Sequence, residues 1–351
     1  MLFGTGRVPA IASIIAGCIL LYWLFLAPAR PLSCADGGST SGSSGMNLLT
    51  SGRNSNRFQY YNMDSLNATS AGSRANEHVL ILTPFKEAAH HIERYFDNIN
   101  RLTYPHNLIS LGFLVSDSKD GTVEKLQQHA RWFQAHRQEP WQQFHRISIF
   151  QKDFSYDLPN TEERHAFNVQ VERRKIMAKS RNTLLSAALT EEISWVLWLD
   201  GDVVEYPATL LEELIALDKD VIAPNCWWHS YNEEGGYDRN NWQETPESRE
   251  FQKTLQPEDV LVEGYPELVT HRKLMMDMRH ENGTTDLFHI VPLDAVGGTC
   301  TLVKASVHRD GAVFPTFPFQ HQVETEGFAK MAKALGYQVW GLPNYLVFHI
   351  I

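Results

Sequence analysis

From residue 76 onward, short apolar runs alternate with segments of helical periodicity, and this alternation constrains the fold more than any other feature. The apolar runs predict strands at 78–83, 108–117, 146–150, 194–200 and 220–225. Helical patterns lie between them at 87–101, 121–136, 169–189 and 208–217. Such alternation is typical of an α/β domain with a mostly parallel central sheet. The sequence therefore predicts one Rossmann-like domain over residues 76–351.

The C-terminal half of this domain is more irregular. Residues 226–288 predict loops with one short strand near Val260, and long irregular segments in compact domains are usually functional. A further block follows, with a strand-bearing segment at 295–307, a helix at 323–335 and a strand pair at 337–340 and 345–350. The aromatic residues of the irregular segment could face sugar rings or cover the core. They are Trp227, Trp228, Tyr231, Tyr237 and Trp242.

Composition narrows the class of protein. The chain has 31 Lys+Arg, 41 Asp+Glu and a net charge of −10, which argues against nucleic acid as a partner. Four cysteines in 351 residues exclude a disulfide scaffold, and their spacing does not suggest zinc. In an oxidising compartment, Cys226 and Cys300 could pair.

The N-terminal region predicts a membrane anchor. Residues 8–27 carry no charge and are long enough to cross a hydrocarbon core of ~30 Å. We interpret 1–7 as a cytoplasmic tail, 8–27 as a transmembrane signal anchor and 28–75 as a flexible Ser/Gly-rich stem. A cleaved signal peptide is the alternative. The expected topology is single-pass type II with a lumenal domain, and sequons at Asn67 and Asn282 are compatible with it.

A candidate metal site follows the apolar run at 194–199. Asp200 and Asp202 flank one glycine where open α/β sheets place ligands, and two such carboxylates can share a divalent cation that grips a diphosphate. A turn with a helix cap is the alternative. His349, near the end of the last predicted strand, could be a further ligand or a satisfied core residue.

The helical pattern at 169–189 places Arg181 on an apolar stripe, so its guanidinium needs a buried anion. A ligand phosphate and a structural carboxylate are equally good candidates. Arg174 and Lys179 are expected to face solvent.

The ends of the first two predicted strands are candidate nucleoside contacts. They carry Thr83, Pro84, Glu87, Asp117 and Ser118. Glu87 and Ser118 could instead act only as caps. The chain holds neither GxGxxG nor a P-loop motif, so a dinucleotide fold is not supported.

Two further pairs of residues lie at the start of a predicted strand and a predicted helix near the C-terminus. Gly297 and Gly298 precede a strand and would allow close approach of a ligand or form a bulge. Glu324 and Glu326 open the helix at 323–335, where the helix dipole alone favours acidic residues.

Several long blocks resemble the fungal mannan-polymerase family of α-1,6-mannosyltransferases, glycosyltransferase family sixty-two, over roughly residues 77–351. The blocks are HVLILTPFKEAAHHIERYFDNINRLTYPHNLISLGFLVSDSKDGT, KSRNTLLSAAL, WVLWLDGDVVEYPATLLEELIALDKDVIAPNCW and VETEGFAKMAKALGYQVWGLPNYLVFHI. The resemblance implies a GT-A fold and a Golgi location. It also leads us to expect that relatives continue beyond the position of Ile351.

Residue by residue, the resemblance implies that Asp200, Asp202 and His349 bind Mn²⁺ on GDP-mannose. It implies that Arg181 lies near the diphosphate and that Glu324 and Glu326 face the acceptor. Nucleoside contacts are implied for Thr83, Pro84, Glu87 and Asp117.

The function implied by the resemblance is retaining α-1,6-mannosyl transfer from GDP-mannose to mannose acceptors on N-glycans. The protein would act with sister subunits in a hetero-oligomeric mannan polymerase of the Golgi membrane. Two alternatives stay open. One is a non-catalytic subunit that binds GDP-mannose as a scaffold, and the other is a glycosyltransferase of different donor or linkage.

Overall fold

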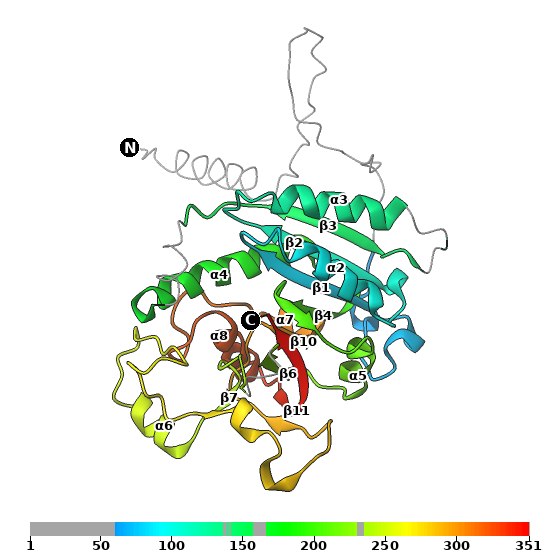
Figure 1. Ribbon diagram of the computed structural model, residues 1–351. Coiled ribbons are helices and arrows are strands. Elements are labelled where there is room, and N and C mark those ends of the chain that lie inside the picture. The colour runs from blue at the N-terminus through cyan, green and yellow to red at the C-terminus, as the bar shows by residue number, and fades with distance from the viewer. Residues whose placement is uncertain (1–59, 136–138, 140–141, 157–165, 230–234, 351) are drawn as a thin grey trace, which may run out of the picture. The chain divides into compact units, whose positions relative to one another are not determined.

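The computed structural model describes residues 60–135, 139, 142–156, 166–229 and 235–350 (Figure 1). The predicted tail, the predicted anchor at 8–27 and the predicted stem up to residue 59 lie outside these ranges. Within them, every helix is too short or too polar for a membrane crossing. Residues 60–75, assigned above to the stem, contain two 3₁₀ turns, η1 (Met63–Ser65) and η2 (Gly72–Ala75).

The described strands fall mainly in one sheet. They are β1 (His78–Phe85), β2 (Ile109–Val115), β3 (Arg146–Gln151), β4 (Ile193–Leu199), β5 (Val203–Glu205), β6 (Val221–Trp228), β7 (Trp242–Gln243), β8 (Lys273–Leu274), β9 (Val291–Pro292), β10 (Cys300–Lys304) and β11 (Val339–His349). The helices are α2 (Ile92–Arg101), α3 (Thr122–Ala135), α4 (Phe167–Ala188), α5 (Leu210–Ala216), α6 (Pro246–Gln252), α7 (Ala305–Arg309) and α8 (Glu324–Ala334). Further 3₁₀ turns are η3 (His106–Leu108), η6 (Met275–Met278) and η7 (Glu281–Gly283).

The main sheet has the order β3-β2-β1-β4-β10-β6-β11-β5, with β9 paired to β11. The first four strands are parallel neighbours, as the strand–helix alternation predicts. Beyond them, β10 runs antiparallel to both β4 and β6, and β11 is parallel to β6 but antiparallel to β5 and β9. The sheet is therefore mixed and not mostly parallel. The strand–helix alternation that predicts parallel neighbours ends at β6, and a long connection of loops, short strands and α6 leads from there to β10.

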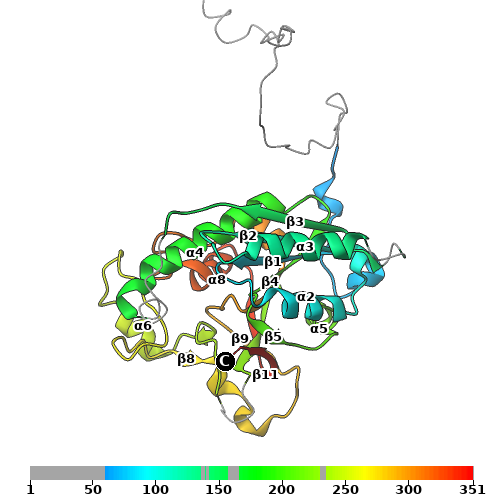
Figure 2. The same cartoon turned by 45° about the horizontal axis from the view of Figure 1, so that its top comes forward.

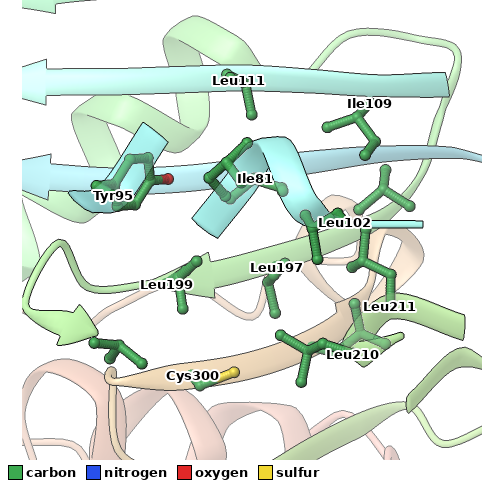
Figure 3. Close-up of a cluster of buried hydrophobic side chains, with 14 of the residues drawn as sticks. Ile81, Tyr95, Leu102, Ile109, Leu111, Leu197, Leu199, Leu210, Leu211 and Cys300 are labelled. Carbon is green, nitrogen blue, oxygen red and sulfur yellow. The ribbon is translucent and has the colours of Figure 1, made fainter. Parts of the chain in front are cut away.

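Helices cover both faces of the sheet (Figures 1 and 2). Along β4 the side chains alternate: Trp195, Leu197 and Leu199 belong to the cluster under α2, α3 and α5, whereas Val196 and Trp198 belong to the cluster under α4, α7 and α8. Figure 3 shows part of the first cluster between β1, β4 and the neighbouring helices. These buried faces fix the strands whose carboxyl ends carry the site.

Several local predictions were wrong. The helix predicted from Glu87 begins at Ile92, because Glu87 lies in a turn with a φ of 49°. The predicted strand pair near the C-terminus is the single strand β11, whose pairing is interrupted around Pro343, a residue that cannot donate to a ladder. Among the described residues, none near Val260 is in a strand, and the short strands of this half are β7 and β8.

The two cysteines proposed as a pair are separate thiols. Cys226 lies in β6 and Cys300 in β10, and both are buried and free. Burial raises the pKa of both thiols well above the usual range for cysteine. They therefore behave as small core residues.

Candidate functional site

The turn at Asp200 and Asp202 joins the end of β4 to β5. The backbone N–H of Asp200 donates to the carbonyl of Thr299 (3.0 Å), and the carbonyl of Asp202 accepts from the N–H of Ile350 (3.0 Å). The turn is thus fixed to the segment before β10 and to the end of β11. Both carboxylates lie at the carboxyl end of a central strand, where the sequence places them.

Arg181 on α4 reaches this turn from inside the protein, with 1% of its surface exposed. Its Nη2 donates to Asp200 Oδ1 (3.1 Å) and its Nε to Glu324 Oε1 (3.0 Å). The guanidinium also lies against the rings of Trp198 and Phe314. Its Nη1 is buried without a hydrogen-bond partner among the described residues. Arg181 is therefore paired with carboxylates of the protein itself, which was one of the two predicted alternatives. Its Nη1 remains as a possible donor to an anionic ligand.

The acidic groups at this turn affect one another's pKa. Burial raises the pKa of the Asp200 carboxyl, Arg181 opposes this effect, and Asp202 and Glu324 raise the pKa further. Burial lowers the pKa of Arg181, but Asp200 and Glu324 outweigh it, so the guanidinium stays charged. Arg181 is thus held between two carboxylates, Asp200 and Glu324, and Asp202 adds a third carboxylate next to Asp200. A divalent cation would stabilise such a cluster of acidic groups.

Asp202 pairs with His349 at the end of β11. His349 Nε2 lies 3.1 Å from Asp202 Oδ2, while its Nδ1 lies 2.6 Å from the carbonyl of Ile350. Donation from Nδ1 to that carbonyl leaves Nε2 facing the carboxylate, and Nε2 is buried without an aligned hydrogen bond in the described part of the chain. The imidazole is fixed by stacking on Tyr237, with ring centroids 3.6 Å apart.

The contact between Asp202 and His349 shifts the pKa of both side chains. Burial lowers the pKa of His349, but Asp202 outweighs burial and the pKa is raised. Burial raises the pKa of Asp202, but His349 outweighs it and the pKa is lowered. An unsatisfied imidazole nitrogen beside a carboxylate fits a metal with mixed nitrogen and oxygen ligands. In the described ranges, however, no three His, Cys, Asp or Glu side chains already form a metal shell.

Several of the predicted nucleoside contacts already form hydrogen bonds with other protein groups. The Thr83 hydroxyl contacts the Leu199 carbonyl and the Tyr95 hydroxyl, each at 2.7 Å. Ser118 Oγ accepts from the N–H of Glu87 (2.9 Å), a bond between two loops that lies outside α2 and α3, so neither residue caps a helix through it.

The Asp117 carboxylate accepts from the backbone N–H groups of Phe154 and Ser155, each at 3.1 Å. Pro84 lies within β1, partly exposed. These loops meet at one edge of the sheet, as the strand order requires, and nucleoside contact remains a prediction.

The paired glycines make room for two buried side chains. A Cβ at Gly298 would lie 2.2 Å from Arg181 Nη2, and a Cβ at Gly297 would lie 1.8 Å from Asp238 Oδ2. Both glycines therefore allow close packing of protein groups, and Gly298 sets the position of Arg181 directly.

The two glutamates of α8 point to different partners. Glu324 has a φ of 54°, uncommon for a residue with a side chain, and binds Arg181. Glu326 is 1% exposed and accepts hydrogen bonds from Arg174 and from Trp242 Nε1 (2.8 Å). The expectation that Arg174 faces solvent was wrong, whereas Lys179 is exposed as expected.

Comparison with known proteins decides the family. The family model described as Anp1 matches residues 57–318. The chain belongs to the Anp1 family. This is the fungal mannan-polymerase family that the sequence motifs indicate.

Curated relatives of this Anp1-family protein are mannan polymerase subunits. The Schizosaccharomyces pombe mannan polymerase complex subunit mnn9 is 44% identical over 300 residues, which cover 85% of this chain and 87% of that protein. The Candida albicans subunit MNN9 is 43% identical over 84% of this chain and 80% of its own length. The Saccharomyces cerevisiae mannan polymerase II complex ANP1 subunit is 38% identical over 85% and 60%.

Solved structures give remote likenesses. The mannosyltransferase PcManGT from Pyrobaculum calidifontis, in complex with GDP-Man and Mn²⁺, has a TM-score of 0.41 and 15% identity, over 78% of this chain and 56% of that one. GalNAc-T7 with UDP, GalNAc and Mn²⁺ has a TM-score of 0.43 and 14% identity, over 78% and 43%.

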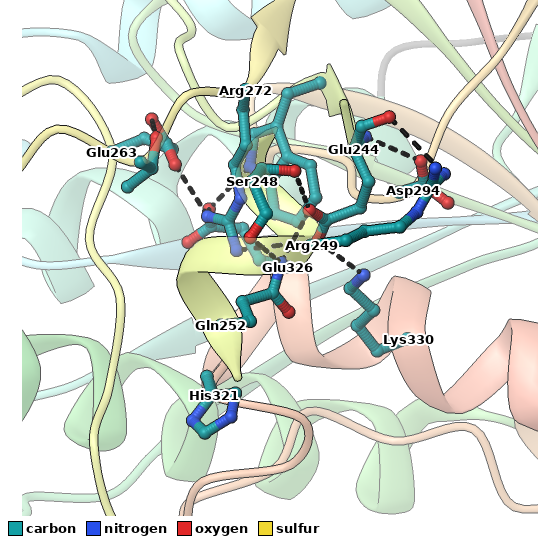
Figure 4. A network of polar contacts seen from close by, with 12 residues as sticks. Glu244, Ser248, Arg249, Gln252, Glu263, Arg272, Asp294, His321, Glu326 and Lys330 are labelled. Carbon is teal, nitrogen blue, oxygen red and sulfur yellow. Dashed lines mark hydrogen bonds and ion pairs between the residues drawn. The ribbon is translucent and has the colours of Figure 1, made fainter. Parts of the chain in front are cut away.

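Sequence reasoning missed a second buried charge network in this Anp1-family protein (Figure 4). The Arg272 side chain is fully buried, stacks on Trp242 at 3.6 Å and donates to Glu263 (2.6 Å). Glu244 accepts from Lys330 (2.9 Å). Most of these residues lie in the irregular segment, where no periodicity indicates which side chains turn inward.

Proposed function

We propose that this Anp1-family protein is a retaining α-1,6-mannosyltransferase of GT-A type that transfers mannose from GDP-mannose to mannose acceptors on N-glycans. One observation carries the proposal: Arg181, fully buried, is held between Asp200 and Glu324 with its Nη1 unpaired. An oriented guanidinium with a free donor beside a pair of acidic residues suits a nucleoside diphosphate and its metal. Family membership supports the sugar, since relatives are named as mannan polymerase subunits.

Manganese is the proposed cofactor. Asp200, Asp202 and His349 would hold it, and the unsatisfied Nε2 of His349 supports this ligand set. When bound, Mn²⁺ would supply Lewis-acid stabilisation of the leaving diphosphate.

The chain's own contribution is positioning and charge. Glu324 and Asp200 orient Arg181, whose remaining donor would bind the diphosphate as negative charge develops on it. The C1–O bond to the diphosphate breaks, the acceptor hydroxyl oxygen bonds to C1 on the same face, and its proton passes to a departing diphosphate oxygen. No side-chain base is needed for this balance. Pre-oriented groups lower the barrier because their alignment is fixed before reaction.

Location and assembly are part of the proposal. The uncharged run at 8–27 supports a type II anchor, with the described domain in the Golgi lumen. The relatives' names refer to complexes with several subunits, so we propose that this chain also works with sister subunits.

A scaffold role is the second candidate. The hydroxyl of Thr83 and the carboxylate of Asp117, both predicted to contact the nucleoside, are already engaged by protein groups. A subunit that binds GDP-mannose without transferring its sugar would tolerate such an arrangement.

The test is calorimetric titration of GDP into the full-length protein with and without Mn²⁺. We expect metal-dependent binding that is lost in the Asp200→Ala/Asp202→Ala variant. The matched control is Asp218→Ala/Asp220→Ala, a second Asp-x-Asp that pairs with Lys304 away from the site. Binding that ignores metal and the first variant would refute the site.

Manganese-dependent hydrolysis of GDP-mannose separates the two candidates. The enzyme should hydrolyse the donor slowly without acceptor, and the scaffold should bind it unchanged. UDP competing as well as GDP would point to another donor.

A further inference from the structure

Several aromatic residues of the irregular segment contact other side chains of the protein. Trp227 and Trp242 each lie against an arginine, with the guanidinium carbon 4.9 Å and 3.6 Å from the ring centroid, respectively. Tyr237 instead lies against the imidazole of His349, with ring centroids 3.6 Å apart and an angle of 18° between the ring planes. One face of each of these rings is therefore taken by a protein group and not by a sugar. The contact of Tyr237 reaches the proposed donor site.

The backbone of His349 is held by the pairing of β11 with β6. His349 is opposite Trp228 in this parallel pair, and its carbonyl accepts from the N–H of His229 (2.8 Å). The imidazole Nδ1 lies 2.6 Å from the carbonyl of Ile350. These contacts hold the backbone and one edge of the ring, so the plane of the ring depends on the side chains that pack against it.

Two aromatic rings set the plane of this imidazole. Tyr237 lies nearly parallel to it, whereas Trp228 meets it edge-on, with centroids 5.5 Å apart and an angle of 89°. Tyr237 and Trp228 also contact each other, with centroids 4.6 Å apart. Stacked and edge-to-face arrangements are both favourable for aromatic pairs. With its plane held in this way, the imidazole keeps Nε2 at 3.1 Å from Asp202 Oδ2.

The turn that carries Tyr237 is anchored to its surroundings. The N–H of Tyr237 donates to the carbonyl of Cys226 in β6 (2.8 Å). A Cβ at the preceding Gly236 would lie 2.2 Å from Met276 Cε, so the backbone packs closely there. The tyrosine ring is thus in place before any metal binds, and such preorganisation lowers the entropy lost on binding.

The Tyr237 side chain adds no charge to the acidic site. Burial raises the pKa of its phenol, and Asp202 and Asp238 raise the pKa further. The hydroxyl therefore keeps its proton at neutral pH. The contribution of Tyr237 to the site is then the face of its ring, which phenylalanine would also supply.

We propose that Tyr237 is a positioning residue that fixes the plane of the His349 imidazole, so that Nε2 faces the divalent cation of the proposed donor site. This inference rests on the proposed function, because it requires His349 to be a metal ligand. Tyr237 would act like other groups that orient histidine ligands from outside the metal shell.

The test is the affinity of the full-length, metal-free protein for Mn²⁺, measured by electron paramagnetic resonance of the free ion. Tyr237→Leu removes the ring and should weaken Mn²⁺ binding about tenfold, because loss of an orienting partner costs about 10–100-fold in metal affinity. Tyr237→Phe keeps the ring and should bind Mn²⁺ like the wild type. If the leucine variant does not fold, Tyr237→Met fills more of the space without a ring and should show the same loss.

Trp227→Leu is the matched control. It also removes a partly buried aromatic ring of this segment, but one that lies against Arg279 and not against His349. Its affinity for Mn²⁺ should be that of the wild type. Equal weakening in Trp227→Leu and Tyr237→Leu would overturn the proposal, because it would show a general loosening of the segment.

Proton NMR without metal provides a second readout. The face of Tyr237 should shift the His349 Hε1 resonance upfield, and this shift should remain in Tyr237→Phe and disappear in Tyr237→Leu. His349→Ala assigns the resonance. If Tyr237→Leu loses the shift but binds Mn²⁺ like the wild type, the proposal alone is overturned. If the folded wild type shows the shift but binds no Mn²⁺, the proposed metal site fails, and the proposal fails with it.

Discussion

Two buried arginine–glutamate pairs join α4 to the first turn of α8, and they differ in what each arginine leaves unpaired. Arg174 donates to Glu326 and to Asn240 Oδ1 (3.0 Å), so both of its terminal nitrogens are used. Arg181 donates to Glu324 and Asp200 but keeps Nη1 without a partner in the described structure. We call Arg174–Glu326 the closed pair, because both terminal nitrogens of its arginine are used, and Arg181–Glu324 the open pair, because one terminal nitrogen of its arginine is not.

The surroundings sharpen this difference. Glu326 also accepts from Trp242, and Arg272 lies nearby, so its carboxylate has protein partners on each side. Glu324 adopts a φ of 54°, and strained backbone is usually retained where function requires it. We therefore interpret Arg174–Glu326 as a structural pair and Arg181–Glu324 as the ligand-facing pair.

Glu326→Ala should have the largest effect on stability. It leaves Arg174 and Arg272 as buried cations without their shared carboxylate, and breaking a buried pair costs about 3–5 kcal/mol. Urea denaturation followed by tryptophan fluorescence would measure the loss. Burial raises the pKa of Glu326, with Arg174 and Arg272 opposing it, which agrees with a carboxylate remote from solvent.

Glu326→Gln is the matched control, because it keeps the shape and an acceptor for Trp242. Its destabilisation should be smaller than that of the alanine variant. A Glu326→Ala protein of normal stability but without transfer activity would show instead that Glu326 faces the acceptor, as the family resemblance implies.

Lysine replacements compare the two arginines directly. Arg181→Lys keeps the positive charge but loses the forked N–H donors of the guanidinium. Turnover should fall about 100-fold, as it does when one oriented donor to a developing negative charge is removed. Arg174→Lys should instead lower the free energy of unfolding by about 1–3 kcal/mol with little change in turnover of the folded fraction. Steady-state kinetics and urea melts on both variants give the answer. Equal losses of turnover in the two variants would mean that the two arginines do not differ in role.

The sequence predicted one of these pairs better than the other. Arg181 was expected to be buried from the apolar stripe of α4, and it is. Arg174 lies seven residues earlier, close to two helical turns, and so shares that face. The spacing thus held the signal that Arg174 is buried, and we misread it.

The partners were less predictable. Asp200 could be placed because it ends a buried strand of the parallel half, where periodicity fixes position. Trp242 and Arg272 come from the irregular segment, whose inward-facing side chains follow from tertiary packing alone. For the same reason β10 could be predicted as a strand but not as an antiparallel insertion between β4 and β6.

Two neighbouring glycines offer a finer test of the open pair. Gly298→Ala would push a methyl group against Arg181 Nη2, whereas Gly297→Ala would push one against Asp238. Overpacking costs about 1–3 kcal/mol in each case. We expect only Gly298→Ala to weaken GDP binding beyond its loss of stability, as measured by calorimetry on folded protein. Equal binding losses in both variants would mean that Arg181 does not touch the diphosphate.

The smallest expected effect is a pH dependence of stability and of Mn²⁺ binding that arises from His349 beside Asp202. The folded-state pKa of His349 is raised, after burial is outweighed by Asp202, so its stabilisation is full below about pH 6.5 and lost as pH rises through the folded pKa. Metal must compete with that proton, so Mn²⁺ affinity should increase as pH rises through the same range.

Asp202→Asn removes the partner that raises the His349 pKa, which should move the stability transition to lower pH. Because Asp202 is also a proposed Mn²⁺ ligand, the same variant should bind Mn²⁺ more weakly at every pH. Thermal melts without metal and Mn²⁺ titrations between pH 5.5 and about 8 would follow the two effects in opposite directions. Arg174→Lys, at the closed pair, should leave the pH profile of metal binding unchanged. A pH profile of stability that moves with Arg174→Lys but not with Asp202→Asn would place the titrating group at the Arg174–Glu326 pair and reverse the comparison.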